Sequence, residues 1–156
     1  LIASKNRVNA ELLDRLLADE FYRAPPPKTA GREQYGREFV NQLVASGLPV
    51  EELIATAAAL TPAAVAVGIE RFAPGRVDEI VASGGGVHNR AIMAYLAAFL
   101  PGVRIRTSDE FGIDADAKEA IAFAVLAYET WNRRPSNLPA ATGARRPVIL
   151  GKVSYA

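Results

Sequence analysis

Three consecutive glycines follow a short apolar segment and are the first feature of this sequence that could do chemistry. The segment ends at Ala82, a helical pattern comes after, and the glycines between them are Gly84, Gly85 and Gly86. Glycines permit positive φ and let a ligand approach the backbone, because no Cβ stands in the way. The first N–H groups of a helix lack internal partners and favour an anion. Ser83–Asn89, which we call the glycine turn, therefore predicts a phosphate-facing loop.

The glycine turn matches neither of two common phosphate-binding patterns. No third glycine follows at the spacing of the GxGxxG dinucleotide fingerprint, and the turn lacks the GxxxxGK[ST] pattern of a Walker loop. The same residues are also consistent with a tight turn that lets the helix pack closely on its strand. Asn89 would add a neutral donor and acceptor in the first helical turn. On these residues alone, both interpretations stay open.

A second group of candidates lies near the start of the last long helical pattern. Glu119 belongs to the very apolar segment Ala117–Leu126. Its carboxylate is either a helix N-terminal charge that faces water, which we favour, or a buried and paired functional group. Four acids precede it and could hold a metal ion, although we favour a solvated loop with capping aspartates; they are Asp109, Glu110, Asp114 and Asp116. We therefore predict no metal site.

Two basic residues are weaker candidates. His88 is the single histidine and has no partner pattern that indicates catalysis, so we expect it to face solvent or to cap a helix. Lys28 follows three prolines and precedes Gly31-Arg32-Glu33, and these residues form a rigid, charged loop. Such loops contact ligands about as often as they merely connect helices.

Composition limits the class of protein. The chain has 156 residues, of which 50% are hydrophobic and 22% charged, as expected for one globular domain. A net charge of +1 and scattered arginines give no indication of nucleic acid binding. The sequence has no cysteine, which excludes disulfides and thiolate metal sites. Thr56, Thr61 and Pro62 interrupt the apolar stretch Ile54–Ile69, so we expect no membrane span and a cytoplasmic location.

Helical patterns fill residues 1–75. Apolar spacing predicts helices over Val8–Leu17, Arg32–Ala45 and 49–72. We expect the helix over Arg32–Ala45 to bury an apolar face that comprises Tyr35, Phe39, Val40, Leu43 and Val44. Pro62 either kinks the longest helix or marks a second helix capped by Thr61.

Strands and helices alternate over residues 76–156. Val77–Ser83 predicts a strand buried on both faces, and a helix follows over about Val87–Leu100. Val103–Thr107 alternates strictly, which predicts a half-exposed strand. The order strand–helix–strand indicates a parallel pair joined by a helical crossover. We expect an α/β fold with a short, mostly parallel sheet covered by helices and preceded by a helical segment.

The last long helix is expected to run from a capping box, formed by Asp116 and Glu119, to about Trp131. It is apolar nearly all round, so we expect it to be buried between other elements. After it, Pro135–Pro147 reads as irregular, and Val148–Val153 reads as a last short strand or a tail.

Several segments in register resemble a single family. These are Pro26-Pro27-Lys28-Thr29-Ala30-Gly31-Arg32-Glu33, similar to a PPKSTGRE motif; Ser83-Gly84-Gly85-Gly86-Val87-His88-Asn89, with a GGGxxN motif; Thr107–Ile113 leading into Lys118–Ala127; Asn137-Leu138-Pro139; Thr142-Gly143-Ala144; and Leu150-Gly151. In this order they resemble the C-terminal part of anhydro-N-acetylmuramic acid kinase. That family belongs to the actin-like ATPase and sugar kinase superfamily. The resemblance covers nearly the whole chain.

The resemblance implies two RNase H-like lobes with ATP and sugar in the cleft between them. The family phosphorylates 1,6-anhydro-N-acetylmuramic acid while water opens the anhydro ring, a step of cell-wall recycling. By resemblance, Gly84, Gly85, Gly86 and Asn89 face the nucleotide, and Glu119 lies on the sugar side. Lys28 and Arg32 are weaker candidates near the nucleotide.

The resemblance also leaves roles unfilled. The family's phosphate loop and catalytic aspartate lie upstream of these motifs, so no catalytic residue is predicted here, and Mg²⁺ would be held mainly by the other lobe. Lys28-Thr29-Ala30 replaces Lys-Ser-Thr, which weakens a polar role for that loop. The chain begins at Leu1 rather than Met, so we expect a C-terminal piece of a larger kinase, inactive alone.

Two alternatives stay open. The first is a non-catalytic nucleotide-binding or dimerisation module, in which Val8–Leu17 and Arg32–Ala45 form the contact face and the protein is a homodimer. The second is another acetylsugar kinase or ATPase of the same superfamily.

Overall fold

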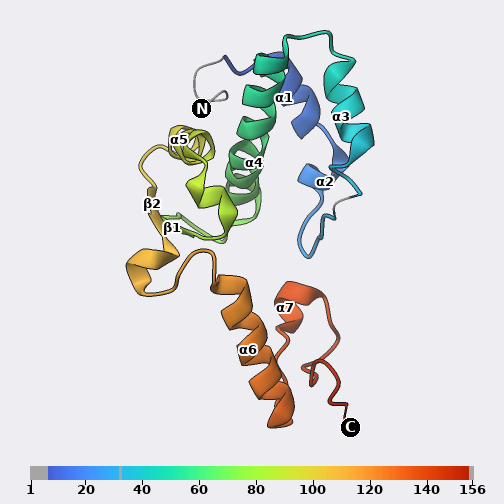
Figure 1. Cartoon of the computed structure of the whole chain (residues 1–156), viewed down its shortest axis with the longest axis vertical. Coiled ribbons are helices and arrows are strands. Elements are labelled where there is room, and N and C mark those ends of the chain that lie inside the picture. The colour runs from blue at the N-terminus through green and yellow to red at the C-terminus, as the bar shows by residue number, and fades with distance from the viewer. Residues whose placement is uncertain (1–6, 32, 155–156) are drawn as a thin grey trace.

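The computed structural model describes residues 7–31 and 33–154 of the chain, so Leu1 and Arg32 lie outside the described residues (Figure 1). The elements alternate between helices and two short strands after a helical first half. In chain order they are α1 (Ala10–Leu17), α2 (Glu20–Arg23), α3 (Arg37–Val44), α4 (Val50–Phe72), β1 (Glu79–Ala82), the 3-10 helix η2 (Gly85–His88), α5 (Arg90–Phe99), β2 (Arg104–Thr107), the 3-10 helix η3 (Ser108–Phe111), α6 (Lys118–Trp131) and α7 (Pro139–Thr142).

Helix α4 is the centre of the packed core. Figure 1 shows it between the α1–α3 group on one side and α5 with the strands on the other. Leu60 and Ala63 pack with Leu13 and Tyr22 on the first side. On the second side, the buried Ala55 meets Ala91 of α5. Alanines at this crossing let the two helix backbones approach closely, and the contact is close-packed.

Pro62 lies inside α4, which is one continuous helix of 23 residues rather than two. Among the described residues, α4 is the one helix long and apolar enough to cross a membrane, an apolar length that the sequence analysis did not expect. Such a composition is also typical of a core helix, and α4 packs on both of its long sides against other helices.

The start of α1 is fixed by two hydrogen bonds. Asn9 is the N-cap, and its side chain accepts a hydrogen bond of 2.9 Å from the backbone N–H of Leu12. Its own backbone N–H donates to the hydroxyl of Thr56 in α4, also at 2.9 Å. Thr56 is fully buried, so this bond ties the first helix to the core helix.

Helix α3 begins at Arg37, five residues later than the sequence analysis expected. Of the expected apolar face, only Leu43 is buried, while Phe39 packs at the edge of the core. Tyr35, Val40 and Val44 are exposed, contrary to expectation. The helix lies at the outer surface of the helical group, so it can bury only a narrow stripe.

The two strands form the predicted parallel pair. Ile80 of β1 is in register with Ile105 of β2, and α5 is the crossover between them. The expectation that β1 is buried on both faces is wrong, because Val81 is 49% exposed. The described residues therefore leave the Val81 side of this narrow sheet partly open.

Helix α6 departs most from expectation. It projects away from the core helices, and only the C-terminal segment with α7 lies beside it (Figure 1). None of its residues is buried, although we predicted a buried helix. The proposed capping box is also wrong, because α6 starts after Ala117 without a side-chain cap. A capping box is formed instead by Thr107 and Glu110, at the start of η3.

The C-terminal segment folds back along α6. The hydroxyl of Thr130 donates to the carbonyl of Leu150, and the backbone N–H of Ser136 donates to Val148 at 3.2 Å. The segment expected to be irregular contains the short helix α7, and residues 148–153 form no strand.

Removing the Thr56 hydroxyl should destabilise the core at a defined place. Thr56→Val keeps the shape of the side chain but leaves the N–H of Asn9 without its acceptor, so we expect a loss of about 1 kcal/mol in the free energy of unfolding. Urea unfolding of the chain measures this loss. Thr142→Val is the matched control, because its exposed hydroxyl bonds to the nearby backbone of Leu138 and Ala144 and does not join two helices. Equal effects of the two substitutions would contradict the role of Thr56.

Candidate functional site

The glycine turn leaves β1 at the carboxyl edge of the sheet. Gly84 has φ of +84°, a conformation that only glycine adopts readily. Its N–H donates to the carbonyl of Ala115 at 2.8 Å, which holds the turn to the segment before α6. The chain then makes one 3-10 turn, η2, before α5 begins. The turn therefore does not open α5 directly, as the sequence analysis expected, but through η2.

The backbone N–H groups of Gly85 and Gly86 are the donors that the turn offers. Both residues are exposed, and among the described residues neither N–H has a hydrogen-bond partner. Consecutive unpaired N–H groups in a turn form a concave site for an anion. The turn can therefore donate two hydrogen bonds to a phosphate or carboxylate.

The glycines at positions 85 and 86 are not needed for packing. A Cβ atom at Gly85 or Gly86 would meet nothing within 4 Å. The tight-turn interpretation required glycines so that α5 could approach its strand, and this contact is missing among the described residues. The space above these two residues is open to a ligand.

Asn89 is the N-cap of α5 rather than a residue of its first turn. Its side-chain oxygen accepts hydrogen bonds from the backbone N–H groups of Ala91, at 3.1 Å, and Ile92, at 3.4 Å. Within the described residues, no hydrogen bond engages its amide NH₂ group. Asn89 can therefore fix the start of α5 with one atom and donate to a ligand with the other.

His88 and Asp116 form a pair that the sequence analysis missed. Nε2 of His88 donates to the Asp116 carboxylate and lies 3.0 Å from each of its oxygens. The two residues are 28 positions apart, and no spacing rule links them. Only the parallel pairing of β1 and β2, which brings both following segments to one edge, could have indicated the contact.

The remaining acids near the turn hold the loop. Asp114 accepts hydrogen bonds from the backbone N–H groups of Asp116 and Ala117, so it stabilises the turn before α6 but does not cap the helix itself. The N–H of Ala115 and the hydroxyl of Thr107 lower the pKa of Asp109 below its usual value. Together these bonds fix the backbone conformation of the loop between η3 and α6, beside the glycine turn.

Glu119 lies in the first turn of α6, one helical turn after Asp116, and its side chain is exposed. This agrees with a helix N-terminal charge facing water, the interpretation that the sequence favoured. It stands on the same edge of the sheet as the glycine turn, because the loop that carries it is bonded to Gly84.

Lys28 is held in the core group instead of at the glycine turn. Its ammonium donates to the carbonyl of Phe21 at 2.8 Å and lies 4.9 Å from the centre of the Phe21 ring. It also lies 5.2 Å from the centre of the Phe72 ring, at the end of α4. These contacts fix the proline-rich loop to α2 and α4. Arg32, the other basic candidate of this loop, lies outside the described residues.

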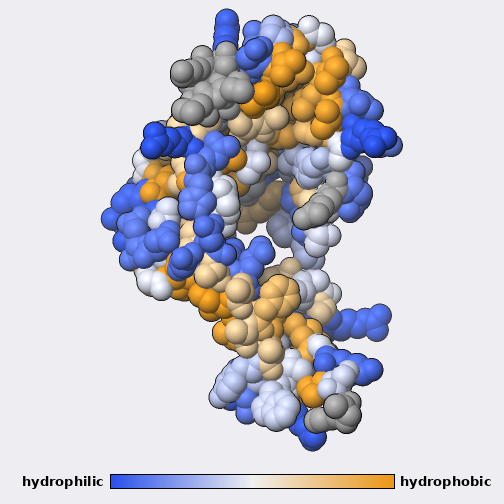
Figure 2. Space-filling view, in the orientation of Figure 1, coloured by the Kyte–Doolittle hydropathy of each residue, from blue (hydrophilic) through white to orange (hydrophobic). Residues whose placement is uncertain are grey.

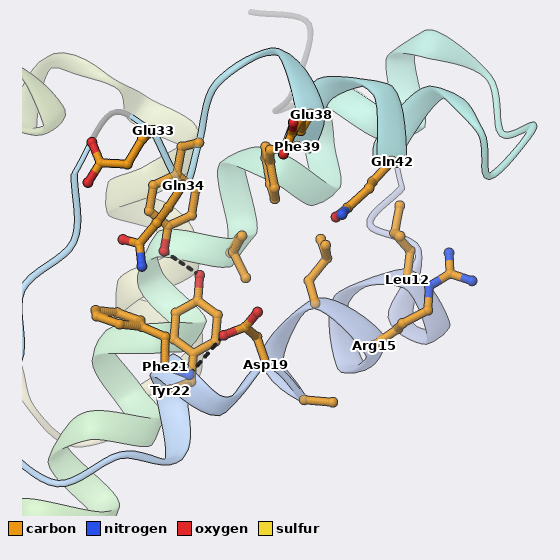
Figure 3. A pocket seen from close by; sticks show the side chains of 14 residues that line it. Leu12, Arg15, Asp19, Phe21, Tyr22, Glu33, Gln34, Glu38, Phe39 and Gln42 are labelled. Atoms are coloured by element: carbon orange, nitrogen blue, oxygen red, sulfur yellow. Dashed lines mark hydrogen bonds between the residues drawn. The ribbon is translucent and has the colours of Figure 1, made fainter.

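A cavity of about 630 Å³ lies elsewhere, between α1, α2 and α3 (Figure 3). Its floor includes Leu12 and Phe39, and its rim includes Asp19, Gln34 and Gln42. The hydroxyls of Tyr22 and Tyr35 meet at 2.8 Å along one wall. None of the glycine-turn residues lines it. This cavity is therefore separate from the candidate anion site.

The fold and the site define an α/β protein with an exposed glycine turn at the carboxyl edge of a parallel strand pair. The profile of the family described as anhydro-N-acetylmuramic acid kinase matches residues 1–156. The chain belongs to the anhydro-N-acetylmuramic acid kinase family.

Curated relatives agree with this assignment. The anhydro-N-acetylmuramic acid kinase of Caldanaerobacter subterraneus subsp. tengcongensis is 44% identical over 159 residues, covering 98% of this chain and 40% of the relative. The Synechococcus elongatus and Gloeobacter violaceus kinases of the same name are 40% and 42% identical, and each match covers 97% of this chain and 41% of the relative. The chain thus spans about 40% of the length of the curated relatives it matches.

Lys28 offers a test of whether its loop is structural. Lys28→Met keeps the aliphatic stem and removes the ammonium. We expect a loss of about 1 kcal/mol in the free energy of unfolding, because the carbonyls of Phe21 and Tyr22 lose a charged donor. Thermal unfolding measures this, and Lys152→Met is the matched control on an exposed lysine. We expect unchanged ADP affinity in the full-length protein. Weaker ADP binding at unchanged stability would instead make Lys28 a nucleotide contact.

Tyr22 should make stability depend on pH in the alkaline range. Burial first, and then the hydrogen bond with Tyr35, raise the pKa of Tyr22 above its usual value. The unfolded tyrosine ionises near pH 10, where the folded one keeps its proton. The folded state then binds more protons, so stability falls as pH rises beyond about 10.

The measurement is urea unfolding of the unaltered chain and of Tyr22→Phe between about pH 8 and 11, a range that brackets the usual tyrosine pKa of about 10. The variant should lose this part of the pH dependence. A slope identical to that of the unaltered chain would show that Tyr22 does not cause it.

Proposed function

We propose that this chain is the C-terminal, nucleotide-binding lobe of an ATP-dependent kinase that acts on 1,6-anhydro-N-acetylmuramic acid. The observation that carries the proposal is the pair of unpaired N–H groups at Gly85 and Gly86, in a chain of this family. These donors would bind the nucleotide phosphates, with Gly84 shaping the turn. Asn89 would donate from its amide NH₂ group to the nucleotide.

The reaction transfers the γ-phosphoryl group of ATP to O6 of the sugar. Water adds at C1, the C1–O6 bond of the anhydro ring breaks, and the water loses a proton; the products are N-acetylmuramic acid 6-phosphate and ADP. In phosphoryl transfer, catalysis is mostly positioning and electrostatic stabilisation. Residues of this chain would supply the positioning of ATP, and Glu119 would face the sugar. The base that takes the proton of water would come from elsewhere in the polypeptide.

Mg²⁺ would neutralise part of the ATP charge when bound. Among the described residues, no group of three potential metal ligands is assembled, and the acids near the turn are engaged by N–H groups. We therefore place the residues that hold the ion mainly in the part of the kinase that the chain does not span.

Helix α6 supports the proposal that the chain is one part of a larger domain. Figure 2 shows hydrophobic residues at the surface along the region that α6 forms. Five large apolar side chains of this helix are between 45% and 72% exposed; they are Ile121, Phe123, Val125, Tyr128 and Trp131. Exposed apolar surface of this extent marks an interface. The rest of the kinase would cover it.

The strand pair also supports the proposal that the chain is one part of a larger domain. Within the described residues, β1 and β2 pair only with each other, so each keeps one edge with unpaired backbone groups. We propose that further strands of the kinase extend this sheet into an RNase H-like (actin-like ATPase) lobe. A cytoplasmic location fits the chemistry, because ATP is the phosphoryl donor.

The alternative of a self-association module receives less support. It places the contact face on α1 and α3 together, and so needs the apolar face of α1 to be free for a partner. That face is instead buried in the core, with Leu12 and Leu13 only 2% and 7% exposed. The dimer is therefore an outcome of the test below.

Nucleotide binding provides the test. In the full-length protein, Gly85→Asp places a carboxylate beside the phosphate donors, so we expect ADP affinity to fall at least about tenfold. Titration calorimetry measures the affinity. Gly75→Asp is the matched control, because a Cβ at that exposed glycine also meets nothing within 4 Å. The isolated chain should bind ADP weakly and transfer no phosphoryl group to the anhydrosugar.

Two results would overturn the proposal. One is measurable turnover by the isolated chain, because the proposal takes the base from the part of the kinase that the chain does not span. The other is unchanged ADP affinity in Gly85→Asp. No response to millimolar ADP, together with a stable dimer in light scattering, would favour the self-association module.

A further inference from the structure

The imidazole of His88 and the carboxylate of Asp116 join the two segments that carry the proposed ligand contacts. His88 ends η2, two residues after Gly86, the second N–H donor of the glycine turn. Asp116 lies three residues before Glu119, the residue proposed for the sugar side. Because Nε2 of His88 lies 3.0 Å from both oxygens of Asp116, the imidazole donates across the gap between the segments.

This contact is one of two that hold the same junction, and a third bond braces the loop on its far side. The N–H of Gly84 donates to the carbonyl of Ala115 at 2.8 Å. The N–H of Ala115 in turn donates to the side chain of Asp109 at 3.2 Å. The backbone contact between Gly84 and Ala115 already closes the junction, so the outer side-chain pair is not needed to close it.

The pair contributes little to folding by itself. Its side chains are 63% and 65% exposed, and exposed ion pairs stabilise a fold only weakly. Its location gives it another consequence. A carboxylate beside a phosphate site repels the ligand, because the two charges have the same sign. Asp116 is the acid of this loop that a residue of the glycine turn itself engages.

We propose that His88 is a positioning residue that holds the Asp116 carboxylate away from the nucleotide phosphates and fixes the distance between the phosphate-binding and sugar-facing segments. The inference rests on the proposed function. It assigns to the only histidine a role in nucleotide affinity and none in proton transfer. Asp116 helps to orient the sugar-facing segment relative to the glycine turn only while His88 is bound to it.

A double-mutant cycle in the full-length kinase tests this role. In His88→Ala the Asp116 carboxylate loses its donor and is free to turn toward the phosphates. We expect KM for ATP to rise about fivefold, the scale of one interaction between exposed charges, with a smaller change in kcat. Asp116→Asn should raise KM less. His88→Ala/Asp116→Asn should bind ATP better than His88→Ala alone, because the repelling charge is gone.

Asp78→Asn is the matched control. Asp78 forms an ion pair with Arg76 at 2.9 Å that is also exposed, but it precedes β1 at the opposite end of the strand. It should leave KM for ATP and the melting temperature unchanged. The melting temperatures of all variants are measured beside the kinetics, since a purely structural pair would lower stability without this pattern in KM.

The outcomes separate this inference from the proposed function. An unaltered enzyme that neither binds ADP nor turns over the anhydrosugar overturns the proposed function, and the inference with it. An active enzyme in which His88→Ala keeps its KM for ATP overturns the inference alone. A double variant that is more impaired than His88→Ala also overturns it, because the pair would then act only as a strut.

Discussion

The candidate site depends on the constraint that parallel strands impose on the chain. A chain that leaves β1 must cross back before it can form β2 alongside in the same direction, and α5 makes this crossing. Both strands therefore release the chain at the same edge of the sheet. The glycine turn and the loop before α6 meet there for that reason. Gly84 and Ala115 are 31 positions apart in sequence, yet they share a hydrogen bond of 2.8 Å.

The helical first half of the chain holds this edge of the sheet in place through α4 and α5. Helix α4 carries α5 on one side, through the contact of Ala55 with Ala91, and the α1–α3 group on the other. Asn89 then fixes the start of α5, and with it the end of η2. A displacement of α4 would therefore move α5, and α5 would move the glycine turn. Lys28 belongs to this support, since its ammonium binds α2 and lies against a ring at the end of α4.

The sequence predicted local features well and long-range partners poorly. Apolar spacing located α1, α4, α5 and the parallel strand pair, because these patterns depend on neighbouring residues. The glycine turn was recognised for the same reason. The burial of α6 was predicted wrongly, since an apolar helix indicates that something covers it but does not say whether the same chain provides the cover. The contact of His88 with Asp116 could not be predicted from the sequence. It forms because both residues lie at the same edge of the sheet, and no local spacing indicates it.

The exposed position of α6 has a consequence for observing this protein. Trp131 is the only tryptophan of the sequence and stands at the end of α6, where it is 68% exposed. An indole in water emits at longer wavelengths than one surrounded by protein. The chain therefore carries its own optical reporter of the surface that α6 presents. Its emission distinguishes a bare α6 from one covered by the rest of the kinase, without any added dye or label.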